Sequence, residues 1–447
     1  MNTIKFLHPR LLVFAGLLIG GAISGSAAQD TGSVVLRGTG WMQDDFIGHS
    51  SDYNGDFNGK SVLSTGAQLS LSDTLSDRFQ VTAGLGVITG TTLQPTATFE
   101  AGYSLPTTNP YVSEASFTYK FLNQDNTKLW LRGGLFPYTY NPDVKDLGLY
   151  LLRGPVHPGI LISGYETEGM LPVANLEGLP VASIMGLQLH HEWGRFQEDF
   201  LLSSETEYYP FFDISPVYVA SYQVHPSLRI GAGVNFYHLI PVNPVLDRYH
   251  GAQYVDYSDT AGGKNPDTTT EISFAGTKLM ATFAFDPKLL MKQGLPFGAE
   301  DLKLYGEVGM IGLEDSKAYR YYFGGYLQRM PVMVGFNIPT FNLLDYLSLE
   351  AEWYDSPFED DLSGYTLTNY SAIPLNSDRN PDTDKWKWSL QGSRTIQKHV
   401  MISLQVANDH YRPGIYNGPA DNPPPLLEAI LVTPKDWYFY VKLSYSF

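Results

Sequence analysis

The stretch WYFYVKLSYSF, residues 437 to 447, decides the fold. Every second residue from Trp437 to Phe447 is apolar or aromatic. The residues between them are polar or carry a hydroxyl group: Tyr438, Tyr440, Lys442, Ser444 and Ser446. Side chains of a β-strand alternate between its two faces, so this period predicts a strand that separates two different solvents.

The stretch closely resembles the final strand of Gram-negative outer-membrane β-barrels. In those proteins a terminal aromatic residue and alternating apolar residues form the assembly signal. The resemblance implies that Phe447, Tyr445 and Leu443 are this signal, read by the barrel-assembly machinery. It also implies that outer-membrane lipid surrounds the protein, because such barrels expose an apolar band to the bilayer.

The first residues carry Lys5, His8 and Arg10, followed by an apolar run and small residues that end at Ala28. This pattern predicts a secretory signal peptide over residues 1–28, with cleavage before Gln29. The mature chain, 29–447, is then a single barrel domain. The sequence has no cysteine, which excludes disulfides and, after the apolar run, a lipoprotein anchor.

Composition excludes two other classes. No stretch after the signal approaches the roughly 20 consecutive apolar residues that a membrane-spanning helix requires. The chain has 46 acidic and 29 basic residues, and two basic residues lie in the signal, so the mature balance is 27 minus 46, or −19. A chain with this charge is a poor partner for nucleic acid, whose phosphates attract Lys and Arg.

Alternating segments recur along the whole mature chain. They predict an all-β fold, a transmembrane antiparallel β-barrel of about sixteen strands, and one hairpin more or less would give eighteen or fourteen. The expected strands are 33–42, 61–72, 79–93, 111–122, 128–136, 180–191, 195–204, 213–224, 228–239, 271–285, 301–313, 327–338, 346–355, 384–394, 400–409 and 434–447.

Short and long connections alternate between these strands. Outer-membrane barrels have short periplasmic turns and long extracellular loops, so this rhythm assigns the two sides and returns both chain ends to the periplasm. A water-soluble β-sandwich explains the alternation equally well. It explains less well the aromatic face of Trp386 and Trp388, followed by the aromatic final strand.

The connection 137–178 is the longest and follows the fifth expected strand. In the general porins that this architecture resembles, that loop folds into the lumen and narrows it. The segment NPDVKDLGLYLLRG, 141–154, reads as a short helix with Asn141 as its cap and Pro142 at its first position. Its many apolar residues favour packing against the barrel wall, whereas an external cap over the mouth is the alternative.

An inward loop would bring charged side chains to a constriction, where they decide which ions pass. The candidates on the loop are Asp143, Lys145, Asp146, Arg153, Glu166 and Glu168. The candidates on the facing wall are Trp130, Arg132, Arg229, Tyr237, Lys303, Tyr305, Glu307, Glu350, Glu352 and Tyr354. For any single one of these residues, plain solvation in a wet lumen is the simpler interpretation.

These features predict a porin of the cell outer membrane for passive diffusion of small hydrophilic solutes, sugars or cations, with no catalytic residue and no cofactor. General porins form homotrimers, although no residue here demands one. The alternatives are a structural or adhesive surface barrel with a blocked lumen and a barrel enzyme. The Asp and Asn residues of 51–60 do not match a calcium-binding loop. Adjacent His190 and His191 point to opposite faces and cannot share a metal.

Overall fold

The structure is a computed structural model of the chain. It describes residues 34–51, 57–90, 107–153, 182–204, 212–242, 275–291, 295–313, 326–355, 385–411, 414–415, 426–427 and 431–447. The expected signal peptide, 1–28, lies outside these residues. No helix among the described residues is long and apolar enough to span a membrane.

Sixteen of the described strands form one closed antiparallel barrel. They are β1 (Val34–His49), β2 (Ser61–Ser76), β3 (Phe79–Gly90), β4 (Thr107–Gln124), β5 (Thr127–Tyr138), β6 (Ala182–Trp193), β7 (Phe196–Ser204), β8 (Ile214–His225), β9 (Leu228–Tyr237), β10 (Gly276–Phe285), β11 (Leu304–Ile311), β12 (Val332–Asn337), β13 (Tyr346–Trp353), β14 (Trp386–Ile396), β15 (Val400–Asn408) and β18 (Trp437–Ser446). A separate two-stranded sheet joins β16 (Gly414–Ile415) to β17 (Leu426–Leu427).

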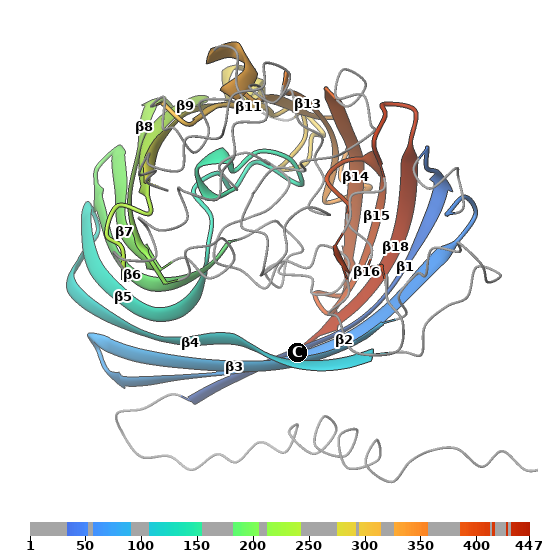
Figure 1. Ribbon diagram of the computed structural model, residues 1–447. Coiled ribbons are helices and arrows are strands. Elements are labelled where there is room, and N and C mark those ends of the chain that lie inside the picture. The colour runs from blue at the N-terminus through green and yellow to red at the C-terminus, as the bar shows by residue number, and fades with distance from the viewer. Residues whose placement is uncertain are drawn as a thin grey trace, which may run out of the picture.

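The barrel closes where β18 pairs with β1, so the sheet has no free edge. Phe447 exchanges two backbone hydrogen bonds with Gly38, of 3.0 and 3.1 Å. Gly38 leaves room for the Phe447 ring, which would lie 2.3 Å from a Cβ at that position. The predicted antiparallel barrel of about sixteen strands is confirmed, and the stretch 437–447 lies at its seam (Figure 1).

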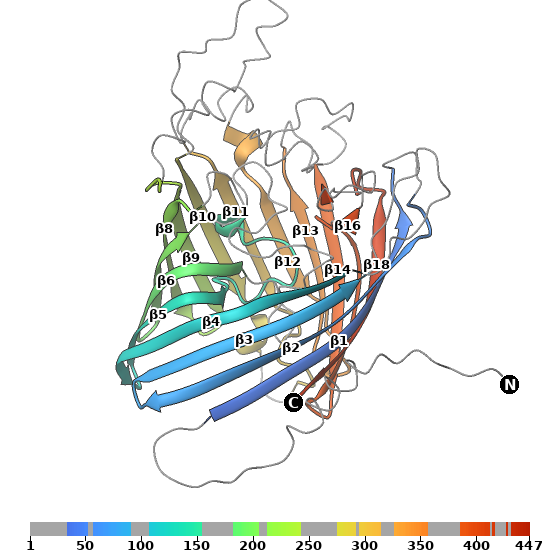
Figure 2. The same ribbon diagram turned by 60° about the horizontal axis from the view of Figure 1, so that its bottom comes forward.

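Each predicted strand corresponds to one barrel strand, with differences at the ends. The first strand was expected to end at residue 42 but continues to His49, because both neighbours keep pairing with it beyond Gly40. The segment expected to begin a strand at 327 instead forms the 3₁₀ helix η6 (Tyr326–Arg329), and β12 begins at Val332. Figure 2 shows the long, strongly inclined β1 to β4 from the side.

The two faces of the wall have opposite polarity. On β13, Ser348, Glu350 and Glu352 are buried, whereas the intervening Leu349 is 45% exposed. On β15, Gln405 is buried while its neighbour Leu404 is 53% exposed. A water-soluble sandwich would bury the leucines and expose the carboxylates. The observed arrangement, apolar outside and polar inside, is instead that of a barrel whose outer solvent is apolar.

Candidate channel constriction

The described part of the connection after β5, residues 139–153, lies inside the ring of strands, and we call it the lumen segment (Figure 1). It ends in the 3₁₀ helix η2 (Tyr150–Leu152), which packs against β9, β10 and β11. One buried apolar cluster joins the segment to the wall. It contains Val144, Leu147, Leu149, Tyr150, Leu151 and Leu152 from the segment and Phe136, Tyr138, Ala182, Ile184, Leu201, Val217, Val219, Met280, Tyr305, Ile311, Met333 and Tyr354 from or beside the strands.

Two glycines of the wall allow the close approach of η2. A Cβ at Gly309 of β11 would lie 2.7 Å from Cβ of Tyr150. A Cβ at Gly233 of β9 would lie 2.5 Å from Cδ1 of Leu151. Both contacts are too short for any side chain, so the inner surface is shaped to receive this segment.

Two wall glutamates accept the backbone N–H groups of the lumen segment. Glu350 accepts from the N–H groups of Lys145, Asp146 and Leu147 at 2.6, 3.0 and 2.8 Å. Glu307 accepts from the N–H groups of Leu149 and Tyr150 at 3.2 and 2.7 Å. Two buried carboxylates therefore satisfy five consecutive or nearly consecutive amides.

This bonding explains why the predicted helix over 141–154 is wrong. Those amides would donate to carbonyl oxygens four residues earlier in a helix, but here they donate to carboxylates of the adjacent wall. The backbone forms turns and bends from 142 to 147, and Gly148 and Leu149 have φ angles of 93° and 59°. Only the short η2 is helical, because tertiary acceptors replace local ones.

Further side-chain bonds complete the attachment. Glu307 also accepts from the Tyr140 hydroxyl at 2.5 Å and from Asn141 Nδ2 at 3.2 Å. Glu352 accepts from the Tyr150 hydroxyl at 2.7 Å and contacts His410 Nε2 at 2.8 Å. His410 follows β15, so the lumen segment is connected through Glu352 to the start of the last long connection.

Charged residues of the segment and the wall form a network near the short turns. Asp143 accepts from Arg229 and from Lys303, the latter at 3.5 Å. Lys145 and Lys303 lie 3.3 and 2.6 Å from Glu300. Burial alone would raise the pKa of Glu300, but these two ammonium groups outweigh it and lower that pKa. Glu300 therefore stays ionised between them.

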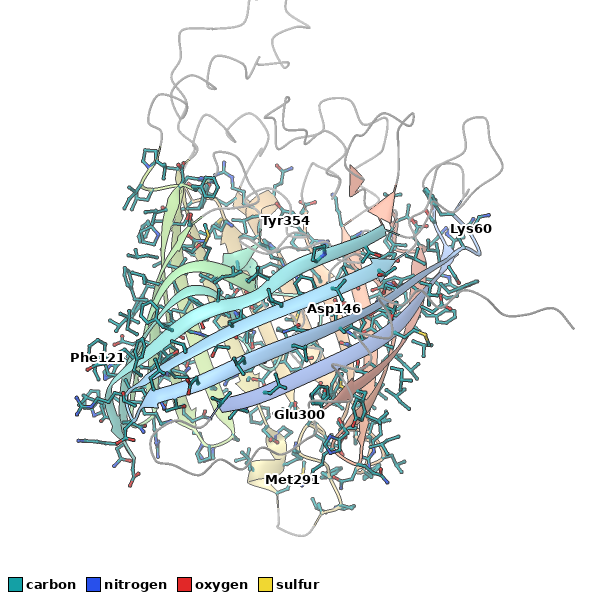
Figure 3. The ribbon with its side chains drawn as sticks, turned by 90° about the horizontal axis from the view of Figure 1, so that it is seen from below. Lys60, Phe121, Asp146, Met291, Glu300 and Tyr354 are labelled. Carbon is teal, nitrogen blue, oxygen red and sulfur yellow. The ribbon has the colours of Figure 1, made fainter. Side chains whose placement is uncertain are left out.

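Asp146 and Arg153 lie deeper in the barrel. Figure 3 places Asp146 between the levels of Tyr354 and Glu300. Asp146 accepts from Gln405 Nε2 at 2.8 Å, and the same nitrogen lies 2.9 Å from Asp409 Oδ2. The guanidinium of Arg153 is buried and donates to the carbonyl oxygens of Gly148 and Asp146. Arg153 thus closes the turn of the segment from within.

The remaining wall candidates occupy a second site on β4 to β7. Arg132 donates to Glu114 at 2.5 Å, and Trp130 stacks on His190 with ring centroids 4.5 Å apart. His190 lies between Asp199 and Glu192, at 2.7 and 3.1 Å. His190 and His191 lie near the end of β6, where only His190 faces inward.

The predicted site residues thus have different environments. The structure brings Asp143, Lys145, Asp146, Arg153, Arg229, Lys303, Tyr305, Glu307, Glu350 and Glu352 together around the lumen segment. Tyr237 lies apart from most of them, beneath the Lys278 ammonium at 5.3 Å, and Tyr354 belongs to the apolar cluster. Glu166 and Glu168 lie outside the described residues. That these groups line a pore stays a prediction.

Sequence reasoning missed the small polar wall of β2 to β4. Its inward residues are partly exposed and, in this part of the chain, carry mostly hydroxyl and amide groups: Gln68, Ser70, Ser72, Gln80, Thr82, Tyr111, Ser116 and Thr118. The polar positions of the period-two pattern mark these residues in the sequence. These residues carry no charge, so charge alone does not single them out as candidates.

Comparisons with known proteins name no family. No family model matches the chain, and no curated protein matches it. Among solved structures, a triple mutant of Rhodopseudomonas blastica porin is 9% identical, with a TM-score of 0.40, and covers 93% of this chain and 100% of its own. A second mutant of the same porin is 10% identical, with the same TM-score and coverage. At this level the likeness carries no argument.

The class of fold is defined instead by the strand pairing, the burial pattern and the lumen segment. The chain is a closed sixteen-stranded antiparallel barrel with an apolar outer face, a polar inner face and a segment bonded to the inner wall. Among the described residues, no group of three or more His, Asp or Glu side chains could hold a metal ion.

Proposed function

We propose that this protein is an outer-membrane porin through which small hydrophilic solutes diffuse passively. The observation that carries the proposal is the inverted polarity of a closed wall together with an inward segment anchored by Glu307 and Glu350. An apolar exterior suits lipid, and a polar interior suits water and dissolved solutes.

Solutes pass between the lumen segment and the wall of β2 to β4 in this proposal. Hydroxyl and amide groups on that wall can exchange hydrogen bonds with sugars and other uncharged polar solutes. The charged network on the other side is largely paired, as in Asp143 with Arg229 and Lys145 with Glu300. The acidic balance of the mature chain favours a mild preference for cations over anions.

Planar-bilayer recording of the purified protein tests the proposal. A porin gives discrete conductance steps in potassium chloride, and a salt gradient gives a reversal potential of the sign expected for cation preference. A protein that inserts but never conducts would instead support the adhesive barrel with a blocked lumen. An anion-selective reversal potential would overturn the cation preference alone.

A further inference from the structure

Two connections at the short-turn end of the barrel expose several large apolar side chains. They are the β10–β11 connection, which contains the 3₁₀ helix η5 (Pro287–Leu290), and the β12–β13 turn. We call the described residues 286–291, 295–303 and 338–345 the turn-end platform. Its exposed apolar side chains include Leu343 at 77% and Leu290 at 60%, together with Leu289, Met291, Leu295 and Phe341. Figure 3 places Met291 beyond the ends of the strands.

Specific bonds hold the platform together. The buried Asp301 accepts from the backbone N–H groups of Gly298, Thr340 and Phe341 at 2.8, 3.0 and 3.0 Å. Asn342 donates to the Pro296 carbonyl at 3.2 Å, and the rings of Phe297 and Phe341 stack at 5.6 Å. These contacts join the two connections into one ordered structure.

Backbone strain accompanies the exposure of Phe341. Phe341 and Asn342 have φ angles of 55° and 66°, in the left-handed region that bulky residues rarely occupy. Strain of this kind persists where the surrounding structure enforces it, and it concentrates at functional positions. Here the strained backbone holds the Phe341 ring in a half-exposed position, so the exposure follows from the conformation of the turn.

Several polar groups of the platform bond to other platform residues. Lys288 Nζ donates to the carbonyl oxygens of Ala299, at 2.9 Å, and Asp301, and lies 3.4 Å from Asp286. Asp286 also caps η5 by accepting from the Lys288 N–H at 3.0 Å. Glu300 and Lys303 pair with the lumen segment, and Asp345 pairs with Arg394 of β14. A surface whose described charges are all bonded while its leucines are exposed suits a lipid boundary better than a hydrated protein partner.

The platform also continues the outer apolar face of the barrel. A Cβ at the outward-facing Gly392 of β14 would lie 3.5 Å from Cδ1 of Leu344 and 3.3 Å from Cδ1 of Leu347. The strand ends beside the platform carry outward Leu304 and Phe336, at 36% and 37% exposure. Apolar surface therefore runs from the wall onto the turns.

We propose that the turn-end platform is a membrane anchor that inserts its leucines and Phe341 into the boundary between headgroups and acyl chains of the adjacent leaflet. Apolar side chains commonly bind membranes at this depth. The anchor rests on the proposed function, which places the barrel in a bilayer. It fixes the height of the barrel on the side where the wall strands are shortest.

Site-directed spin labelling tests the anchor. Because the chain contains no cysteine, each introduced cysteine is the single labelling site of its variant. Nitroxide labels are placed at Leu343→Cys and Leu290→Cys in full-length protein reconstituted in phosphatidylcholine vesicles. Leu404→Cys on the outer wall is the deep control, and Asn126→Cys in the β4–β5 turn is the water control. The ratio of collision rates with oxygen and with a water-soluble nickel chelate reports depth.

We expect the platform labels to give ratios several-fold above that of Asn126→Cys and below that of Leu404→Cys. Ratios equal to that of the water control would overturn the anchor. So would spin–spin broadening that fades on dilution with unlabelled protein, because it would show a second copy on the platform. If Leu404→Cys itself is accessible to the nickel chelate, the membrane placement of the barrel fails, which is a different result.

Discussion

The wall of β2 to β4 and the wall of β9 to β13 share the same alternating pattern, but they differ in strand length and in their inward residues. The first has strands of 12 to 18 residues whose inward side chains mostly carry hydroxyl and amide groups. The second has strands of 6 to 10 residues, and its inward carboxylates bind the lumen segment. In our proposal, solutes pass along the wall of β2 to β4, whereas the lumen segment covers the wall of β9 to β13.

This difference shows that inward charged residues can anchor a segment of the chain as well as set the electric field of a channel. Glu307 and Glu350 satisfy backbone amides that would otherwise be buried without acceptors, so they act first as anchors. Gln68 and Thr82 bind no such segment among the described residues and are partly exposed. Substitutions on the two walls should therefore have unequal effects on channel conductance.

The largest effect is expected from Glu350→Leu. It removes the acceptor for three backbone N–H groups and for the Tyr305 hydroxyl, and each buried donor left unbonded costs about 1–3 kcal/mol. The lumen segment should detach, and single-channel recordings should show larger and noisier conductance while the barrel still folds. Gln68→Leu on the open wall is the matched control and should leave the noise unchanged. Equal noise in both variants would remove the distinction between the two walls.

A smaller effect is expected from Gly309→Val. The new side chain occupies the space of Tyr150, and overpacking of this kind costs about 1–3 kcal/mol. The charges are unchanged, so conductance should shift without a change in ion selectivity. Gly90→Val is the control, because a Cβ there has no neighbour closer than 3.7 Å. Wild-type conductance for Gly309→Val would show that η2 does not narrow the channel.

The smallest effect concerns pH and the turn end of the covered wall. Burial alone would raise the pKa of Asp301, but the N–H groups of Thr340, Gly298 and Phe341 outweigh it and hold that pKa below its ordinary value of 3.8. The ionised form is thus stabilised by folding, and this contribution is present above pH 4 and is lost as the pH falls through the lowered pKa. Urea unfolding of the barrel at pH 6 and pH 3 measures it. Asp301→Asn should show a smaller loss on acidification, and an unchanged loss would contradict the role of Asp301.

Much of the fold could be predicted because strand alternation and turn residues are local features of the sequence. Alternation located every barrel strand. The end of β1 could not be located from residues 43–49 alone, since its pairing with β2 and β18 decides it. The helix expected at 141–154 failed for the same reason, because partners distant in sequence accept its amides.

The candidate site was predicted in part. Charge and inward facing were readable for Glu307, Glu350 and Glu352, since both follow from residue type and strand period. Their partners were not readable, because Glu350 is separated from Lys145 by 205 positions. The hydroxyl and amide residues of the β2 to β4 wall follow the same strand period, but they carry no charge that would single them out as candidates.

The sequence by itself determined an all-β chain of alternating strands ending in 437–447, because side-chain period and turn residues are local properties. Only the tertiary structure decided that Phe447 packs on Gly38 at the seam, that carboxylates of one wall bind the lumen segment, and that the turns at one end form an apolar platform. The physical reason is that closure and burial join residues far apart in the chain, and no local pattern records such contacts.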